Sequence, residues 1–369
     1  MGAAPRDDAG PLRVAIDASA LRAGRSGIGV YVEQLMAALP AAGVLPLPFS
    51  NRTVPGWPRA GRLPLRPTAL WTRLVAEAQA GWQEAALVHY PTGRAPGSAR
   101  WPRVVTVHDL WPFEAGAQLS RRERWLTLPG LRRGILTADR IIAVSQDTAN
   151  ALGRHFPGRS ERVVVIPEGP SLDPRQATWS LAELRERLRL SAGQPYWLHV
   201  GTLEPRKGLD TVVMGAGAAR EGLRRAGCPP SQLPALVLAG ADGGRSKALR
   251  RLAAEHGLAD GLRLLGFVPQ ALLASLYREA AAYVALSLHE GFGLAALDAM
   301  VFGVPLLSSG AGALHALAGP QGALHIPAGD HAALATALLA LRQDPRLAQG
   351  LAEAGRRAAG RYSWSRCAQ

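Results

Sequence analysis

Short apolar runs rich in β-branched residues alternate with longer helical patterns in both halves of the chain, and this alternation constrains the fold more than any other sequence feature. Consecutive strands joined by helices form parallel sheets that helices cover on both faces. The expected strands are Val14–Ile16, Leu87–His89, Val104–Val107, Arg140–Val144, Val163–Ile166, Tyr196–Val200, Ala235–Ala239, Leu262–Phe267, Tyr283–Ser287, Pro305–Leu307 and Ala323–Ile326. The expected helices include Val30–Leu39, Ser180–Leu190, Lys247–His256, Pro269–Ala280 and Leu294–Phe302. The pattern predicts an α/β protein with two doubly wound, Rossmann-like domains.

The length also fits two domains, because 369 residues exceed what one hydrophobic core usually organises. Proline and glycine cluster at Pro167–Pro174, directly after an expected strand. We therefore place the first domain at residues 1–174 and the second at 175–355.

Composition excludes several other classes of protein. Cys228 and Cys367 are the only cysteines, which excludes a disulfide scaffold and fits a reducing cytoplasm. The N-terminal residues are charged where a signal peptide is apolar, and glycine and proline interrupt the uncharged run at 299–329. We therefore expect a cytoplasmic protein without a membrane span. The net charge of +14 comes from forty arginines and two lysines spread along the chain, so nucleic acid is not an expected partner.

The most specific motif is Leu288–Met300, which follows an expected strand and opens a helix. Gly291 and Gly293 allow a ligand to approach the backbone, and a helix start favours an anion such as phosphate. Glu290 and Asp298 offer carboxylates to sugar or ribose hydroxyls at the two ends of an extended ligand.

Three further clusters follow expected strands. Gly201–Gly208 places Arg206 beside Lys207, a pair that can grip a diphosphate. The glycine-rich segment Gly24–Tyr31 is either a phosphate-binding turn or an ordinary turn. His108 ends an apolar strand, where a histidine either exchanges protons or is simply packed.

Taken in order, these motifs resemble glycosyltransferase family four. The resemblance rests on the Gly-rich loop, His108-Asp109-Leu110, Gly201–Lys207, and Glu290-Gly-Phe-Gly with an acid eight residues later, and it extends over nearly the whole chain. It implies a GT-B fold, with two Rossmann-like domains facing across a cleft, and a C-terminal helix at residues 356–369 that crosses back to the first domain. It also implies a first domain on the acceptor side and a second domain that binds a nucleotide-diphosphate sugar.

The resemblance assigns a role to each matching residue. Glu290 would contact the donor sugar, Asp298 the ribose diol, and His108 would lie by the reacting sugar. Arg206 and Lys207 would stabilise the leaving diphosphate. The remaining donor-binding positions it implies are Gly27, Gly29, Thr202, Gly291, Phe292, Gly293 and Leu294. Asp298 and Thr202 depart from the family pattern, which usually has Glu and Arg there, and Ala316 stands where Glu is common.

The implied reaction is retaining transfer of a mannose-like or rhamnose-like hexose to a glycan or lipid-linked acceptor during polysaccharide assembly. No cofactor is expected, and the sequence has no Asp-x-Asp run or His/Cys set that would argue for a metal. A sugar phosphorylase, a nucleotide-sugar epimerase and a non-catalytic homologue remain as alternatives.

Two arginine- and tryptophan-rich segments suit docking on an anionic membrane, although a solvated basic face explains them equally well. The first contains Arg52, Arg59, Arg62, Arg66 and Arg73 with Trp57, Trp71 and Trp82; the second contains Arg121, Arg122, Arg124, Arg132 and Arg133 around Trp125.

Overall fold

The computed structural model of the chain describes residues 10–21, 26–51, 61–62, 85–96, 101–114, 125 and 127–369. The chain forms two compact units, one of Met1–Gly169 with Tyr362–Gln369 and the other of Pro170–Arg361, called units 1 and 2 below. The division falls at Gly169–Pro170, where the sequence predicted 174–175. The predicted C-terminal helix at 356–369 is two helices instead, α15 (Pro345–Ala359) and α16 (Trp364–Ala368), and the second belongs to unit 1.

Unit 1 is built on a parallel sheet in the order β3-β2-β1-β4-β5-β6-β7. Its strands are β1 (Leu12–Asp17), β2 (Val44–Ser50), β3 (Gly61–Arg62), β4 (Leu87–Tyr90), β5 (Arg103–Val107), β6 (Arg140–Ala143) and β7 (Val163–Val165). Its helices are α1 (Gly27–Ala38), α4 (Trp111–Glu114), α6 (Leu128–Thr137), α7 (Gln146–His155) and α16. Apolar residues of α6 and α7 pack in one core, and those of α1 and α16 pack in another.

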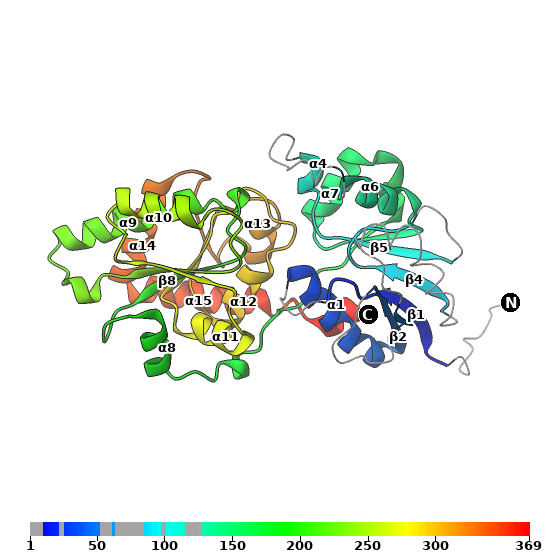
Figure 1. Ribbon diagram of the computed structural model, residues 1–369, viewed down its shortest axis with the longest axis horizontal. Coiled ribbons are helices and arrows are strands. Elements are labelled where there is room, and N and C mark those ends of the chain that lie inside the picture. The colour runs from blue at the N-terminus through cyan, green and yellow to red at the C-terminus, as the bar shows by residue number, and fades with distance from the viewer. Residues whose placement is uncertain are drawn as a thin grey trace. The chain divides into compact units, whose positions relative to one another are not determined.

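Unit 2 has a parallel sheet in the order β10-β9-β8-β11-β12-β13. Its strands are β8 (Tyr196–Val200), β9 (Ala235–Ala239), β10 (Leu262–Gly266), β11 (Ala282–Ala285), β12 (Leu306–Ser308) and β13 (Leu324–His325). Its helices are α8 (Leu181–Leu188), α9 (Leu209–Arg225), α10 (Ser246–Glu255), α11 (Gln270–Glu279), α12 (Leu294–Phe302), α13 (Ala313–Ala318), α14 (His331–Gln343) and α15. Helices α9, α10 and α14 lie on one side of the sheet and α11 and α12 on the other (Figure 1). Two parallel, helix-covered sheets confirm the predicted α/β class.

Strand β2 was missed by the sequence analysis because Pro46 and Pro48 interrupt it. The Phe49 carbonyl accepts from the Ala18 N–H and therefore points toward β1. Backbone groups of successive residues in a strand point to opposite sides, so those of Pro46 and Pro48 point toward β3. Strand β3 pairs only with Phe49 and Ser50, beyond both prolines. The prolines therefore remove no hydrogen bond from the pairing of β1 with β2.

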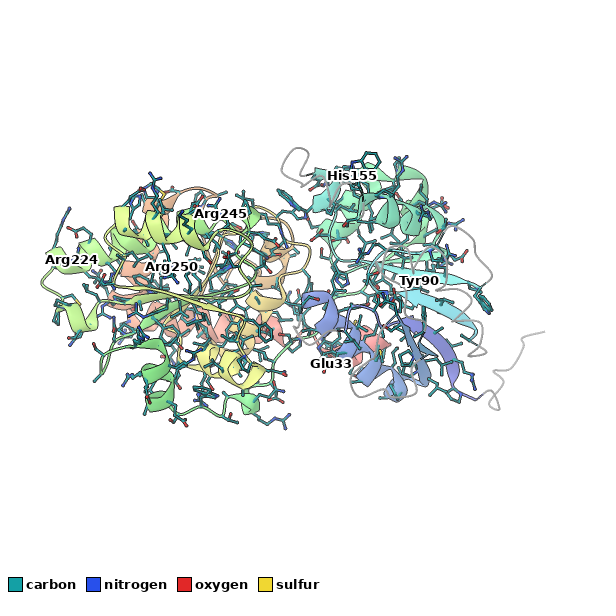
Figure 2. The ribbon with its side chains drawn as sticks, viewed as in Figure 1. Glu33, Tyr90, His155, Arg224, Arg245 and Arg250 are labelled. Carbon is teal, nitrogen blue, oxygen red and sulfur yellow. The ribbon has the colours of Figure 1, made fainter. Side chains whose placement is uncertain are left out.

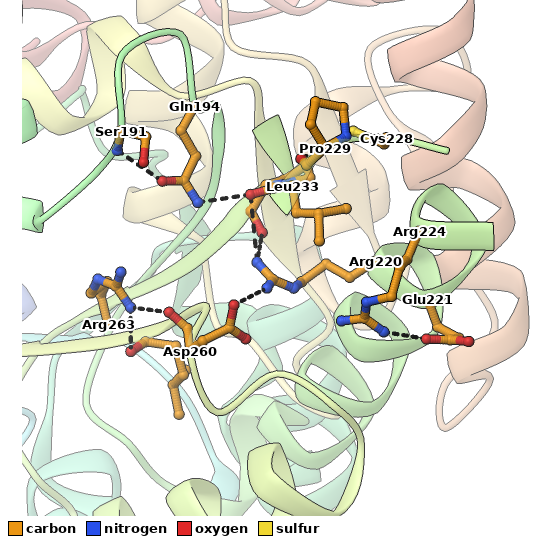
Figure 3. A network of polar contacts seen from close by, with 12 residues as sticks. Ser191, Gln194, Arg220, Glu221, Arg224, Cys228, Pro229, Leu233, Asp260 and Arg263 are labelled. Carbon is orange, nitrogen blue, oxygen red and sulfur yellow. Dashed lines mark hydrogen bonds and ion pairs between the residues drawn. The ribbon is translucent and has the colours of Figure 1, made fainter. Parts of the chain in front are cut away.

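A buried arginine joins the loops at the amino edge of the unit 2 sheet (Figure 3). Arg220 of α9 is 1% exposed; one guanidinium nitrogen donates to the Pro234 carbonyl at 2.8 Å, and another donates to Asp260 at 2.7 Å. Gln194 donates to the Leu233 carbonyl in the same network. These bonds fix the loops that enter β9 and β10, at the opposite edge from the residues described next.

Candidate functional site

The loops after β8, β11 and β12 are joined at the carboxyl edge of the unit 2 sheet. The Leu288 N–H donates to the Arg206 carbonyl at 2.7 Å, and the Ser309 hydroxyl donates to the Ser287 carbonyl at 2.6 Å. Gly208 has φ +65°, and a Cβ there would lie 2.1 Å from the Leu286 carbonyl oxygen. Only glycine tolerates both this left-handed backbone and so close an approach. Gly208 therefore allows the loops after β8 and β11 to pack together.

This junction brings three predicted residues into contact. The Lys207 ammonium donates to Glu290 Oε1 at 2.5 Å, and Arg206 Nη1 lies 3.7 Å from Glu290 Oε2. Arg206 Nε also donates to Glu204 at 2.9 Å, and the Ser287 hydroxyl lies 3.1 Å from Glu290 Oε1. The side chains of Lys207, Arg206 and Glu290 are 12%, 21% and 18% exposed, so the cluster is sheltered but reachable from solvent.

The cations determine the charge state of this cluster. Burial alone would raise the pKa of Glu290, but Lys207, Arg206 and the hydrogen bonds from Lys207 and Ser287 hold that pKa below its ordinary value. Glu290 is therefore an anion at neutral pH. Burial and the nearby Lys207 charge lower the pKa of His199, at the end of β8, to about 4, so this imidazole is neutral.

Helix α12 starts beside the cluster. Gly293 has φ +97° at its N-cap, where a Cβ would lie 2.7 Å from the Leu314 side chain. The first N–H groups of a helix lack partners within the helix and attract negative charge. Buried Phe292 and half-buried Leu294 flank this glycine, and half-buried Thr202 lies in the loop after β8.

Asp298 lies on the same helix but is bound within unit 2. It is 2% exposed and accepts from the Ser171 N–H at 2.7 Å, from the Ser171 hydroxyl and from the Leu172 N–H at 3.2 Å. A ribose diol would have to displace these donors. The ribose contact therefore stays a prediction, and the hydrogen bonds from Ser171 and Leu172 give Asp298 a structural role as well. Burial raises the pKa of Asp298 to about 7, although all three donors stabilise its anion.

Unit 1 carries the other predicted residues. Ser26 caps α1 by accepting from the Gly29 N–H at 3.1 Å, and Gly27 is the first residue of the helix. A Cβ at Gly29 would lie 3.1 Å from the Ala20 carbonyl, so the helix start sits close to the loop after β1. Residues 24 and 25 of the glycine-rich loop lie outside the described residues.

His108 follows β5 and has partners on both ring nitrogens. Nδ1 lies 3.0 Å from Glu168 Oε1 and Nε2 lies 2.9 Å from the Pro91 carbonyl oxygen. Sequence reasoning missed Glu168, Glu204, Ser287 and Ser171. A polar residue at the end of an expected strand, as at Ser287, or just beyond it, as at Glu168, is a signal that could have found these two residues.

The basic residues that suggested a membrane surface are only partly described. Trp125 is 77% exposed, and α6 carries exposed Arg132 and half-buried Arg133, whereas the other members of both segments have no described side chain. A cavity of about 470 Å³ near α6 is lined by Phe113, Arg132, Leu136, His155, Phe156, Pro157, Gly158 and Arg159. It adjoins the carboxyl ends of α6 and α7, where cations neutralise helix carbonyls, so its basic lining has a structural explanation.

In unit 2, Arg224 lies on α9, Arg250 lies on α10 and Arg245 directly precedes α10 (Figure 2). Among the described residues, no helix is long and apolar enough to cross a bilayer, and no group of three His, Cys, Asp or Glu side chains is arranged to hold a metal ion.

Comparison with known proteins identifies this arrangement. The family model "Glycosyl transferases group 1" matches residues 181–358, and "Glycosyltransferase Family 4" matches residues 25–173. A D-inositol 3-phosphate glycosyltransferase of Nocardiopsis dassonvillei is 30% identical over 83% of this chain and 75% of its own length. The chain belongs to glycosyltransferase family four.

Other relatives and solved structures agree with this assignment. The chain matches about half the length of two further D-inositol 3-phosphate glycosyltransferases, 51% for that of Streptomyces avermitilis (31% identical, 63% of this chain) and 48% for that of Nocardia farcinica (34% identical, 58% of this chain). Sucrose-phosphate synthase of Thermosynechococcus elongatus has a TM-score of 0.72 with 25% identity over 96% of both chains. HepE of Anabaena, solved with UDP and glucose, has a TM-score of 0.70 with 19% identity over 97% of both chains. The family-four chain therefore has the GT-B fold that its motifs predicted.

Proposed function

We propose that this protein is a retaining glycosyltransferase that moves a hexose from a nucleotide-diphosphate sugar to an acceptor hydroxyl. The observation that carries the proposal is the contact of Lys207 and Arg206 with Glu290 beside the start of α12. Two cations, one sugar-binding carboxylate and a helix start provide the charges that a diphosphate and its attached sugar require. Family-four relatives named as glycosyltransferases and a structural neighbour solved with UDP support it.

In the proposed reaction the anomeric C–O bond to the diphosphate breaks and a new C–O bond to the acceptor forms on the same face. The acceptor proton passes to an oxygen of the departing diphosphate. Lys207 and Arg206 stabilise the negative charge that develops on the leaving oxygen. Glu290 accepts hydrogen bonds from sugar hydroxyls. Because these cations can fill the role of a divalent ion, we expect full activity in the presence of EDTA.

The proposed donor is a mannose-like or rhamnose-like nucleotide sugar, and the proposed acceptor is a glycan or lipid-linked intermediate of cell-envelope or exopolysaccharide assembly. The names of the relatives favour a second candidate acceptor, a phosphorylated polyol of the inositol phosphate kind. Nucleoside diphosphate release that depends on one acceptor class and not the other distinguishes the two.

The test is a thermal-shift panel of GDP, UDP, ADP and dTDP sugars, followed by turnover assays with the stabilising donor. Acceptor-dependent release of nucleoside diphosphate supports transfer. Phosphate-dependent cleavage would indicate a phosphorylase instead, conversion of the donor alone would indicate an epimerase, and the absence of all three would indicate a non-catalytic homologue.

We also propose that the enzyme works in the cytoplasm at the inner face of the plasma membrane. The exposed Trp125 ring and the exposed Arg132 of α6 support this location, since basic residues bind anionic headgroups at about 1 kcal/mol each. Sedimentation with phosphatidylglycerol vesicles at low salt tests it. We expect Trp125→Ala and Arg132→Ala to weaken binding, and Arg250→Ala on α10 to leave it unchanged. Equal binding by all variants would contradict this surface.

A further inference from the structure

A group of buried polar side chains lies at the carboxyl ends of β4, β5 and β7 in unit 1. His108 Nδ1 lies 3.0 Å from Glu168 Oε1, and the Thr106 hydroxyl lies 2.8 Å from His89 Nε2 and 3.1 Å from the Tyr31 hydroxyl. The Tyr31 ring meets the His108 ring edge-on at 4.9 Å between centroids. Neither the family motifs nor the proposed reaction assigns a role to Glu168.

The partners of His108 decide where its protons are. The Pro91 carbonyl oxygen can only accept, so Nε2, 2.9 Å away, carries a hydrogen. Nδ1 faces a carboxylate oxygen, which is also an acceptor when Glu168 is ionised. An ionised Glu168 therefore requires hydrogens on both ring nitrogens, which makes His108 an imidazolium.

The same contacts favour the protonated form of His108. Burial lowers its pKa, but the hydrogen bond and charge of Glu168, the Pro91 carbonyl and the charge of Asp109 together raise it above the ordinary value. The other described titratable groups around the ring carry no positive charge that would compete with His108 for Glu168. Burial and the His108 charge lower the pKa of His89 on β4 to about 3, so His89 is neutral.

The remaining neighbours are also neutral. Burial raises the pKa of the Tyr31 phenol on α1, and burial with the nearby Glu168 raises the pKa of the Cys367 thiol on α16 to about 12. Among the described residues, the carboxyl groups that raise the pKa of His108 are Glu168 and Asp109.

Burial makes the two charges depend on each other. Glu168 is 2% exposed, and its Oε2 has no hydrogen-bond partner among the described residues. A buried carboxylate with one unpartnered oxygen is costly unless a cation is fixed beside it. The His108 side chain, in contrast, is 17% exposed, and both of its nitrogens lie within hydrogen-bond distance of protein oxygens.

We propose that Glu168 is a positioning residue that holds His108 as an immobile, doubly protonated imidazolium, which presents a fixed positive charge to a substrate oxygen instead of a nitrogen that exchanges protons. The effect on turnover rests on the proposed glycosyl transfer, whereas the protonation state does not.

The experiment is an NMR titration of the full chain labelled with ¹⁵N-histidine, with His108 assigned through His108→Gln. In the natural sequence we expect both His108 nitrogens to stay protonated at pH 7. Glu168→Gln keeps the shape and can pair with a neutral ring, so we expect the midpoint of the His108 titration to fall by at least one pH unit. Glu168→Asp retains the charge and should restore most of the shift. A His108 that is neutral at pH 7, or a midpoint unchanged in Glu168→Gln, overturns the proposal.

Turnover provides the second readout. With the donor found in the thermal-shift panel, we expect kcat/KM of Glu168→Gln to fall as the pH rises through the lowered midpoint, by about tenfold relative to the natural sequence at pH 8, and to approach it at low pH. An equal loss at every pH would mean a purely structural role and would overturn the electrostatic part. Because the NMR titration needs no substrate, failure of the proposed transfer reaction cannot be mistaken for failure of this inference.

Discussion

Each unit holds a carboxylate–cation pair just beyond the carboxyl ends of its strands, but the two pairs are built differently. In unit 2, Glu290 and Lys207 are 18% and 12% exposed, and Arg206 supplies a second cation. In unit 1, Glu168 is 2% exposed and its cation is a histidine held at both nitrogens. A lysine on a flexible stem can leave its carboxylate for a phosphate, whereas a ring fixed at both nitrogens cannot. The comparison predicts that the unit 2 pair rearranges on binding and that the unit 1 pair remains in place.

The largest expected effect is a difference in kcat between alanine variants of the two lysines of the chain, Lys207 and Lys247. Lys207→Ala should lower kcat by roughly 10²–10³-fold, or about 3–4 kcal/mol, because it removes one donor from the developing charge on the leaving group. Lys247→Ala makes the same chemical change at an exposed position of α10 and should leave kcat within about twofold. Steady-state assays of both variants check this. Equal activity of the two variants would show that Lys207 does not stabilise the leaving group.

The junction that supports the unit 2 pair can be broken without touching a charge. Gly208 and Gly257 both have φ +65°, but a Cβ at Gly208 would lie 2.1 Å from the Leu286 carbonyl oxygen, whereas one at Gly257 would meet nothing within 4 Å. Gly257→Ala should therefore cost only the left-handed backbone, about 1 kcal/mol of unfolding free energy. Gly208→Ala adds overpacking and should cost about 2–4 kcal/mol.

Urea unfolding of both variants gives the two free energies. If Gly208→Ala matched Gly257→Ala in stability and also retained donor binding, the contact of the loops after β8 and β11 would be unnecessary for the unit 2 site.

Asp298 extends the comparison, because it is a buried carboxyl group of unit 2 with no cation among the causes of its pKa shift in the part of the chain that the structure describes. Its pKa rises from 3.8 to about 7, so the folded protein binds more protons than the unfolded chain between about pH 4 and pH 7. The free energy of unfolding contributed by this residue therefore falls as the pH rises across that interval. Between pH 5 and pH 7.5 the loss should be roughly 2 kcal/mol.

Asp298→Asn retains acceptors for the Ser171 and Leu172 N–H groups and has no such titration. Chemical denaturation of both proteins at several pH values isolates the difference. A constant difference in unfolding free energy between pH 5 and pH 7.5 would mean that Asp298 is already ionised at pH 5. Donor binding by Asp298→Asn then reports separately on the predicted ribose contact.

The sequence identified the elements that carry the unit 2 site because they are local. Strand β8 is a contiguous apolar run and α12 begins at a glycine, so both were predicted with the bounds that the structure shows. The partners of the charged groups could not be predicted in this way. Ser171 reaches Asp298 across 127 positions and Glu168 reaches His108 across 60, and no local pattern records which strand ends meet. The sequence suggested which residues carry charge, but only packing determined how deeply each one is buried.

The smallest expected effect on turnover comes from the most buried cation of unit 2. Arg220 is 1% exposed, like the buried Glu168, but it lies at the amino edge of the sheet and its acid, Asp260, is 70% exposed. Arg220→Met would remove bonds to the Pro234 carbonyl and to Asp260 while relieving the burial of a charge, so we expect a net loss of about 1–2 kcal/mol in unfolding free energy. Because the exposed Asp260 can turn to water, kcat and the pH profile should not change. A shift of the pH profile in Arg220→Met would show that buried charge anywhere in unit 2, and not only at the strand ends, controls the reaction.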